Sequence, residues 1–260
     1  RQGSDPHFLH ATGRKLGSEQ ISETTLMRII LITGGTRGIG FAIVKSLLAA
    51  GDKVAFTGTT ADGVVKAEHA LAAAGNAVGI VCDVRDAASV QRAVETVVQR
   101  FGGLDVLINS AGVGVGAPIA DLPNDEWDRI IGTNLTGVYN CCKAAIPHLR
   151  SRGAGWIVNI SSLSSTGPFP GGAAYVASKA GVNAFSDALM QELREENIRV
   201  TTVLPGSVAT GFNNREPGTG ADWKLLPEDV AHAIVDLLDH PPRSLPSRIE
   251  IRPSKPKRSG

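Results

Sequence analysis

The sequence contains few of the residues that mark disulfide-stabilised, membrane-spanning or nucleic-acid-binding proteins. It has three cysteines among 260 residues, and 26 Lys and Arg are balanced by 25 Asp and Glu. So few thiols exclude a disulfide framework and favour a reducing compartment, and a net charge of +1 gives no field that would attract nucleic acid or an anionic membrane. No apolar run approaches the ~18 residues of a membrane span. We therefore expect a cytoplasmic globular protein with neither nucleic acid nor membrane as a partner.

A metal-ligand pattern is also missing. His7 and His10 are three residues apart in a polar opening segment, and the adjacent Cys141 and Cys142 on one predicted helix cannot both face a single ion. We expect no metal site. The basic tail with Lys255, Lys257 and Arg258 is too short to indicate nucleic-acid binding, and a solvated terminus explains it.

From residue 27 onward the hydrophobic pattern predicts one α/β domain. Seven short apolar runs are typical of buried strands, and each is separated from the next by enough residues for a crossover helix: 29–32, 54–56, 78–82, 104–108, 156–160, 200–204 and 249–251. Near-continuous apolar strands joined by amphipathic helices indicate a sheet covered on both faces. We expect a doubly wound sheet of about seven mostly parallel strands over residues 27–252, with long helices at 124–149 and 174–195. Residues 1–26 are expected to be a disordered leader or tag-derived segment, and 253–260 a basic tail.

A glycine-rich turn follows the first predicted strand and opens a helical pattern. Its sequence is Thr33-Gly34-Gly35-Thr36-Arg37-Gly38-Ile39-Gly40. Glycine lets the backbone approach a diphosphate closely, and the free N–H groups of a helix N-terminus favour an anion. The spacing lacks the Gly-Lys-Ser/Thr of a P-loop, which disfavours ATP hydrolysis. The turn is either a dinucleotide phosphate site or an ordinary tight connection.

Two residues of a later helix form a candidate proton-transfer pair. Tyr175 and Lys179 are four residues apart, which places both side chains on one helix face. At ~5 Å and an effective dielectric of ~20, the ammonium would stabilise a phenolate by about 3 kcal/mol. The spacing therefore predicts that Lys179 lowers the phenol pKa by about 2 units, toward a working range for acid–base catalysis.

Taken in order along the chain, several motifs together resemble the short-chain dehydrogenase/reductase family. They are Thr33-Gly34-x-x-x-Gly38-x-Gly40, Asn109-Ser110-Ala111-Gly112, Asn134, Ser162, Tyr175-x-x-x-Lys179 and Pro205-Gly206-Ser207-Val208-Ala209-Thr210. The resemblance covers essentially residues 27–252 and implies a Rossmann-like fold, a nicotinamide dinucleotide cofactor and a homodimer or homotetramer. Four of the motifs follow strands 1, 4, 5 and 6, where an open parallel sheet binds its ligand.

The resemblance also implies catalytic roles. Tyr175 would protonate the carbonyl oxygen as hydride arrives and act as the base in reverse, and Lys179 would lower the phenol pKa and hold ribose hydroxyls. Ser162 would hydrogen-bond the substrate oxygen, with Ser161 as the weaker candidate. Asn134 resembles the residue that holds a water and links Lys179 to solvent, although a buried, satisfied helix asparagine is the alternative.

The cofactor-binding residues implied by the same motifs span the whole domain. They are Gly34, Thr36, Arg37, Gly38, Ile39, Gly40, Asp83, Val84, Asn109, Ala111, Gly112, Tyr175, Lys179, Pro205, Gly206, Val208 and Thr210. Ser110 stands where the family more often has a second asparagine, and we expect sheet stabilisation and cofactor contact to survive this departure. Asp83 resembles a residue that contacts adenine, or it is only a turn aspartate.

The end of the second predicted strand favours NADP over NAD. A cofactor with free ribose hydroxyls is usually held by a carboxylate there, but the sequence reads Thr57-Gly58-Thr59-Thr60, and Asp62 is expected to cap the next helix. Arg37, with hydroxyls from Thr59 or Thr60, would pair with a 2′-phosphate. Alternatively, Arg37 is a solvated surface arginine.

We therefore expect an NADP(H)-dependent oxidoreductase that acts on a small carbonyl or alcohol. The alternative is a catalytically silent NADP-binding regulator or scaffold, because a fold alone does not establish an activity. The segment 211–224, which contains Phe212 and Trp223, is expected to form a lid over the substrate. The sequence does not identify the substrate, and an acyl-carrier-bound 3-oxo group is a reasonable first choice for an assay.

Overall fold

Seven strands form one parallel sheet in the order β3-β2-β1-β4-β5-β6-β7. The structure, a computed structural model, describes residues 27–71, 75–114, 116–212 and 223–255. The strands are β1 (Ile29–Thr33), β2 (Lys53–Gly58), β3 (Ala77–Val81), β4 (Val106–Asn109), β5 (Gly155–Ile160), β6 (Ile198–Pro205) and β7 (Arg248–Ile251). The predicted Rossmann-like, doubly wound sheet is confirmed.

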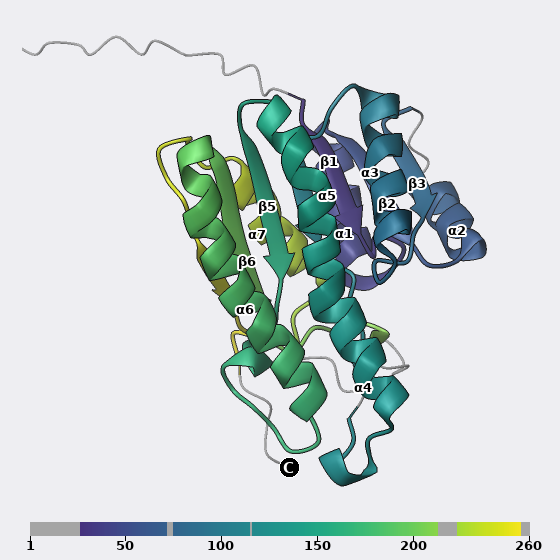
Figure 1. Ribbon diagram of the computed structural model, residues 1–260, viewed down its shortest axis with the longest axis vertical. Helices are drawn as coiled ribbons and strands as arrows, with labels where there is room; N and C mark the ends of the chain where they lie inside the picture. Colours follow the sequence, from purple (N-terminus) through teal and green to yellow (C-terminus); the bar gives the residue numbers. More distant parts are fainter. Residues whose placement is uncertain (1–26, 72–74, 115, 213–222, 256–260) are drawn as a thin grey trace, which may run out of the picture.

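Helices cover both faces of the sheet (Figure 1). They are α1 (Gly38–Ala49), α2 (Ala61–Leu71), α3 (Ala87–Phe101), α4 (Asn124–Ile131), α5 (Gly137–Ser151), α6 (Ala173–Leu193) and α7 (Pro227–Leu238). Alternate side chains of each strand face opposite layers: Leu31 packs with α3, α5 and α6, whereas Ile30 and Ile32 pack with α1, α2 and α7. The two apolar cores explain why the strands are apolar without polar alternation.

The predicted helix 124–149 is interrupted in the structure. One π turn, η2 (Gly132–Thr136), separates α4 from α5, and Asn134 lies within it. Such turns are frequent at functional sites, and a 3.6-residue hydrophobic period does not reveal them. The predicted helix 174–195 corresponds to α6.

The expectation that Asp62 caps the second helix is wrong. Helix α2 starts at Ala61, and the hydroxyl of Thr60 accepts a hydrogen bond from the backbone N–H of Gly63 at 3.2 Å. Thr60 therefore caps the N-terminus of α2 by accepting from one of its free backbone N–H groups, and Asp62 lies in the first turn. Six of the seven strands begin one or two residues away from their predicted starts. Strand β4 begins two residues later, β6 begins two residues earlier, and β2, β3, β5 and β7 each begin one residue earlier.

The sheet order creates a crevice between β1 and β4. The chain leaves β1 toward β2 and β3 on one side, and β4 to β7 continue on the other. At the carboxyl edge Thr33, Asn109 and Asn159 lie in register on the neighbouring strands β1, β4 and β5. This is the switch point at which parallel sheets bind ligands.

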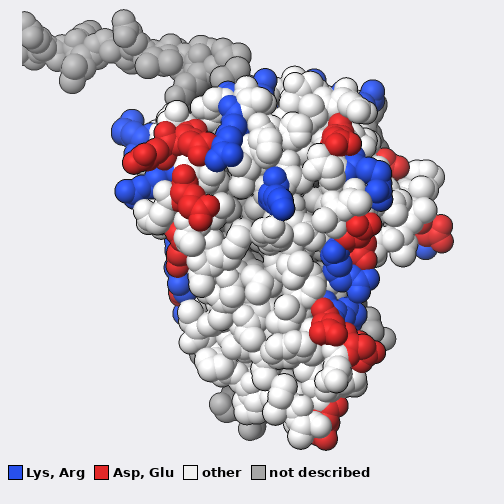
Figure 2. Space-filling view, in the orientation of Figure 1, with Lys and Arg blue, Asp and Glu red and all other residues white. Residues whose placement is uncertain are grey.

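The surface, the cysteines and the helix lengths add three observations. In the view of Figure 2 charged side chains lie mainly along the upper part and the edges, whereas the central and lower area, where Figure 1 shows α5 and α6, is largely uncharged. All three cysteines are buried and free. In the part of the chain that the structure describes, no helix is long and apolar enough to span a membrane.

Candidate active site

A cavity of about 1290 Å³ lies at the carboxyl edge of the sheet. It brings together nearly all of the residues that the sequence selected. Its walls include Gly34, Thr36, Arg37, Gly38, Ile39, Gly40, Thr59, Thr60, Asp83, Val84, Ala111, Gly112, Ser162, Tyr175, Lys179, Pro205, Gly206, Val208 and Thr210. The volume is large for a single small molecule, and the cavity is wide enough for a dinucleotide together with a substrate.

The glycine turn fits tightly against its neighbours. Gly34 has φ +68°, and a Cβ there would lie 2.7 Å from the Cα of Ala111. A Cβ on Gly40 would collide with the carbonyl oxygen of Gly34. At Gly34 the turn after β1 packs directly against the loop after β4. At Gly40 the first turn of α1 packs directly against the backbone of the glycine turn. Both glycines are therefore required by the shape of the cavity floor.

Two threonines hold this floor in place, and the sequence analysis named them only within longer motifs, without a role of their own. The hydroxyl of Thr33 accepts hydrogen bonds from the backbone N–H groups of Ser110 and Ala111, both at 3.1 Å. The hydroxyl of Thr57 accepts from the N–H of Gly34 at 3.3 Å. Because Ser110 is held through its backbone, its departure from the family motif leaves this connection intact. The signal that identifies both threonines is a hydroxyl residue at or next to the end of a strand.

Lys179 is the most buried charged group of the site. Its side chain extends from α6 into the cavity wall, where the ammonium donates to the carbonyl oxygen of Ile160 at 2.8 Å. The residue is only 5 % exposed. Desolvation lowers the pKa of Lys179 from 10.5 to about 8. An ammonium has three N–H donors, so two remain for a ligand.

Tyr175 lies one turn before Lys179, with the Lys179 Nζ 5.9 Å from the centre of its ring. Burial raises the pKa of Tyr175, and a hydrogen bond with Ser162 opposes this by lowering it. The predicted direction of the phenol pKa is therefore wrong for the protein alone. Burial outweighs the other influences, and the group that opposes it is Ser162. Sequence spacing shows that two groups are near one another, but it does not show how much water they lose.

The two candidate serines after β5 have different surroundings. Ser161 is buried, and its hydroxyl donates to the backbone carbonyl of Lys179 at 3.1 Å, so it ties β5 to α6. Ser162 lies in the cavity wall together with Tyr175, and its hydroxyl acts to lower the phenol pKa. The geometry supports Ser162 as the residue that meets a ligand.

Asn109 and Asn134 do not line the cavity. Asn109 is buried beneath it and donates its side-chain amide to Asn159 at 2.8 Å. The amide of Asn134 exchanges two hydrogen bonds with the backbone of Val113, both 2.8 Å long. A Cβ placed on Gly112 would lie 3.5 Å from the Oδ1 of Asn134 and 3.6 Å from the Nζ of Lys179, so both groups flank the same glycine.

At the far end of the cavity, beside β2, the side chain of Arg37 could bind an anionic group of a ligand. Arg37 is exposed, lies just before α1 and donates to the carbonyl oxygen of Gly211 at 3.3 Å. Thr59 and Thr60 line the same end. The acidic residue in the cavity wall is Asp83. Its carboxylate forms an ion pair of 2.6 Å with Arg85, and this contact lowers the pKa of Asp83. Within the residues described, a carboxylate is thus missing where NAD-binding sheets usually carry one.

Two aromatic side chains that the sequence analysis did not place in the site line its catalytic end. Phe169 lies in the wall and is half exposed, and the ring centre of Phe212 is 5.8 Å from that of Tyr175. Phe212 was expected only as part of a lid, and most of that segment, residues 213–222, lies outside the described residues. An apolar rim beside a polar pair is typical of a pocket that positions an organic substrate.

A dinucleotide fits this arrangement. The glycine turn leaves a cradle that a Cβ would fill, the helix α1 points its N-terminus at that cradle, and Arg37, Lys179 and Lys224 all contribute positive charge to the walls. Ribose hydroxyls suit the free donors of Lys179, and a diphosphate suits the backbone N–H groups of the turn.

The sequence was compared with family models and with curated proteins, and both comparisons match dehydrogenases. The family model of the short chain dehydrogenases matches residues 28–219. A 3α-hydroxysteroid dehydrogenase of Mediterraneibacter gnavus is 35 % identical over 222 residues, which is 81 % of this chain and 89 % of that protein.

Two solved structures share the fold. One, an alcohol dehydrogenase of the archaeon Thermococcus sibiricus in complex with 5-hydroxy-NADP, has a TM-score of 0.83 and 29 % identity and covers 90 % of this chain and 100 % of its own. The other, a 3-ketoacyl-(acyl-carrier-protein) reductase of Brucella melitensis in complex with NADH, has a TM-score of 0.80 and 27 % identity, with 87 % and 97 % covered. The match of the family model to most of the chain, together with these relatives, confirms the resemblance: the chain belongs to the short-chain dehydrogenase/reductase family of oxidoreductases.

Proposed function

We propose that the protein transfers a hydride between NADP(H) and a small carbonyl or alcohol compound, with Tyr175 as the general acid and base. The observation that carries this proposal is the position of Tyr175, which shares the wall of one cavity with Ser162 and lies beside the buried ammonium of Lys179. A phenol between a hydroxyl donor and a cation is suited to exchange a proton with a substrate oxygen.

The chain's own residues would handle the proton and the orientation of the substrate. When bound, the nicotinamide cofactor supplies or accepts the hydride. In reduction, Tyr175 donates its proton to the carbonyl oxygen, and Ser162 holds the same oxygen by a hydrogen bond. In oxidation, the phenolate of Tyr175 removes the alcohol proton. Lys179 favours that phenolate through its charge and uses its free donors for the ribose.

Proton supply to Tyr175 is the proposed task of Lys179 and Asn134. Both lie against Gly112, and Asn134 occupies the π turn between α4 and α5. A water held at this point would connect the ammonium with solvent. The saturated side-chain amide of Asn134 keeps the turn attached to Val113 at 2.8 Å, which supports a fixed geometry for such a relay.

The preference for NADP is supported by the residues beside β2. A 2′-phosphate carries between one and two negative charges, and Arg37, Thr59 and Thr60 line the end of the cavity where a second-strand carboxylate would otherwise bind free ribose hydroxyls. The solved relatives were obtained with 5-hydroxy-NADP in one case and NADH in the other, so this part of the proposal depends on the chain's own residues.

We also propose that the protein is a homodimer or homotetramer. The face that α5 and α6 present in Figure 2 carries few charged residues, and the aromatic side chains of Trp127 on α4 and Tyr139 on α5 are exposed. Such a surface supports packing against a second copy of the chain. Light scattering coupled to size exclusion would return a mass of two or four chains, and a mass of one chain would contradict this part of the proposal.

The proposed chemistry is tested by following NADPH absorbance with a panel of carbonyl compounds that includes a 3-oxoacyl thioester and a 3-oxosteroid. We expect at least one to be reduced, and Tyr175→Phe to lower its turnover by roughly 10²–10⁴-fold while NADPH binds within about threefold of the wild-type affinity. The matched control is Tyr139→Phe, since Tyr139 is the other tyrosine of the chain and lies exposed on α5. Cofactor binding without turnover of any compound would favour the silent regulator or scaffold.

A further inference from the structure

We propose that Ser164 is a positioning residue, whose hydroxyl donates to the Oγ of Ser162 and so directs the Ser162 proton toward Tyr175 and the substrate oxygen. This inference rests on the proposed function and deepens it. Ser164 belongs to the short helix η3 (Leu163–Ser165) that follows β5, and none of the family motifs used above includes it.

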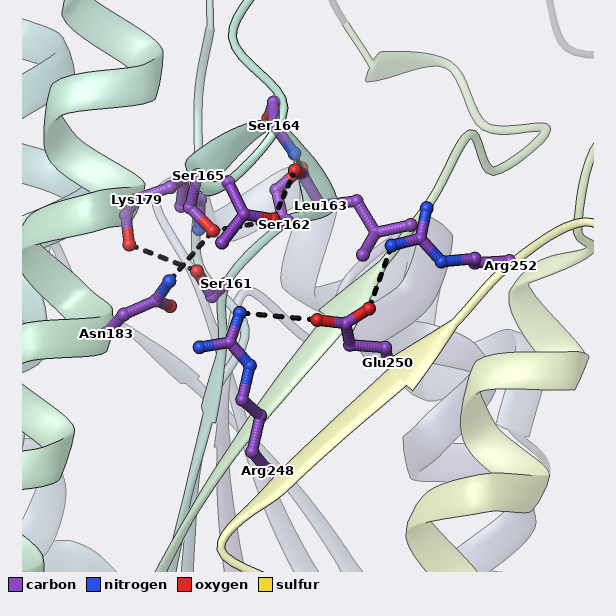
Figure 3. Close-up of polar contacts among 11 residues, drawn as sticks. Ser161, Ser162, Leu163, Ser164, Ser165, Lys179, Asn183, Arg248, Glu250 and Arg252 are labelled. Atoms are coloured by element: carbon purple, nitrogen blue, oxygen red, sulfur yellow. Dashed lines mark hydrogen bonds and ion pairs between the residues drawn. The ribbon is translucent and has the colours of Figure 1, made fainter.

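The Ser162 side chain is held by the turn that it begins. Ser162 has extended backbone angles and caps η3, with its Oγ accepting from the backbone N–H of Ser164 at 3.2 Å. The same Oγ lies 2.7 Å from the Oγ of Ser164 (Figure 3). One neighbour therefore contacts the reactive hydroxyl twice, once through its backbone and once through its side chain.

The count of donors and acceptors decides what this double contact does. A hydroxyl has one hydrogen to donate and two lone pairs. The N–H of Ser164 fills one lone pair of Ser162. If the Ser164 hydroxyl fills the second, the only hydrogen-bonding capacity left on Ser162 is its own proton. Ser162 can then act toward Tyr175 or a carbonyl oxygen only as a donor, which is the role that catalysis requires.

The opposite orientation, with Ser162 donating to Ser164, is the one that the proposed function disfavours. It would use the Ser162 proton inside the turn, so Ser162 could not donate to an ionised Tyr175 or to a substrate oxygen. Among the described residues, Ser162 is the only side chain that hydrogen-bonds the Ser164 hydroxyl, so donation to Ser162 also satisfies Ser164. A chain of donors from Ser164 through Ser162 to Tyr175 strengthens each bond in turn.

The backbone of Ser162 is fixed separately, from the helix that carries the tyrosine. The hydroxyl of Ser165 donates to the Ser162 carbonyl oxygen at 2.5 Å, and the amide of Asn183 donates to the Ser165 hydroxyl at 2.8 Å. Figure 3 shows Asn183 and Lys179 extending from α6 toward this turn. With the main chain held to α6, rotation of the Ser162 hydroxyl is the remaining freedom, and Ser164 removes it.

The first test compares Ser164→Ala, Ser164→Thr and a matched control in the direction of alcohol oxidation, which needs the phenolate. In the Ser164→Ala enzyme we expect the pKa of the rising limb of kcat against pH to move upward by about 0.5–1 unit, with a 3–10-fold loss of rate below that limb. Ser164→Thr keeps a hydroxyl and should restore the wild-type profile. The control is Thr166→Ala, because the Thr166 hydroxyl also bonds a carbonyl of this turn, that of Leu163, without touching Ser162.

A second measurement needs no substrate. The chain has two tyrosines, so a Tyr139→Phe background leaves Tyr175 as the only phenol that ionises in an ultraviolet titration. Ser164→Ala should raise the pKa seen in that titration by the same amount. If turnover is observed and neither pKa moves, the inference about Ser164 is wrong and the proposed function stands. If no substrate turns over but the titration shifts, the proposed function fails and the placement of the Ser162 proton stands.

Discussion

Asn109 donates its side-chain amide to the side-chain oxygen of Asn159 at 2.8 Å, across the pair of register partners that end β4 and lie near the end of β5. Asn159 in turn donates to the hydroxyl of Ser186 on α6 at 2.8 Å. All three side chains are buried. This chain of hydrogen bonds connects the middle of the sheet with the helix that carries Tyr175, directly beneath the cavity.

The first prediction follows from this chain. Asn109→Ala strands the buried oxygen of Asn159, so the free energy of unfolding should fall by about 1–3 kcal/mol, measured by urea denaturation. The Asn109→Ala/Asn159→Ala double variant should lose less than the sum of the single losses, because the stranded acceptor is gone. Unchanged stability together with a tenfold weaker NADPH affinity would instead mean that Asn109 contacts the cofactor directly, as the sequence motif implied.

The second prediction concerns the cofactor. Arg37→Ala should raise the Kd for NADPH by roughly 10–30-fold and change the Kd for NADH by less than about threefold, since one charge-assisted hydrogen bond to the 2′-phosphate is lost. Thr59→Asp should have the complementary effect, tightening NADH and weakening NADPH through a carboxylate at the end of β2. Fluorescence titration measures both constants.

A matched control for the cofactor prediction is Arg92→Ala, which removes an exposed arginine of α3 that does not line the cavity. Its affinities for both cofactors should equal those of the wild type. If NADH binds the wild-type protein more tightly than NADPH and Arg37→Ala affects neither, the proposed preference is wrong.

The third prediction concerns the cavity floor. Gly40→Ala introduces a Cβ that collides with the carbonyl oxygen of Gly34, both within the turn that is to hold the diphosphate. We expect at least a tenfold loss of cofactor affinity, because backbone that must shift to relieve the collision no longer presents its N–H groups correctly. Isothermal titration calorimetry measures the loss. Gly103→Ala serves as the control, since its Cβ would approach only the side chain of Arg152. Equal affinities for the two variants would contradict the role assigned to Gly40.

The fold was predictable from the sequence because it depends on patterns that repeat along the chain. Apolar runs such as 29–32 and 200–204 became buried strands, and their separation by long segments required parallel crossovers. The order of the strands placed Gly34, Ser162 and Tyr175 at one edge, and the cavity confirms that they line it together.

Details that depend on local competition were not predictable. The π turn at Asn134 has no periodic signature, and Thr60 rather than Asp62 caps α2 because the chain reaches its helical start two residues earlier. The phenol pKa required knowledge of burial, which spacing does not contain. Ser164 remained unnoticed because a third serine in a serine-rich turn has no distinguishing pattern, and only its distance to Ser162 reveals it.

The last prediction treats Lys179 as a group that costs stability. Its pKa is lowered from 10.5 to about 8 by desolvation, so between these values the unfolded chain binds more protons than the folded chain does. The free energy of unfolding should therefore rise with pH across this window, and the penalty is fully present below pH 8. Lys179→Met removes the penalty. At pH 7 we expect the cofactor-free variant to be more stable by about 1–3 kcal/mol, less than the full shift implies because the hydrogen bond to Ile160 is also lost.

Urea denaturation at several pH values between 7 and 10.5 measures this effect, with Lys45→Met, an exposed lysine of α1, as the control that should show no such gain. The advantage of Lys179→Met should shrink as the pH approaches 10.5, where both states of the wild type lose the proton. The same variant should reduce turnover strongly if Lys179 has the proposed role, because the ammonium proposed to favour the phenolate of Tyr175 is then gone. A Lys179→Met protein that is less stable than the wild type at pH 7 would contradict this prediction. It would show that the hydrogen bond to Ile160 outweighs the cost of desolvation, so that Lys179 stabilises the folded protein.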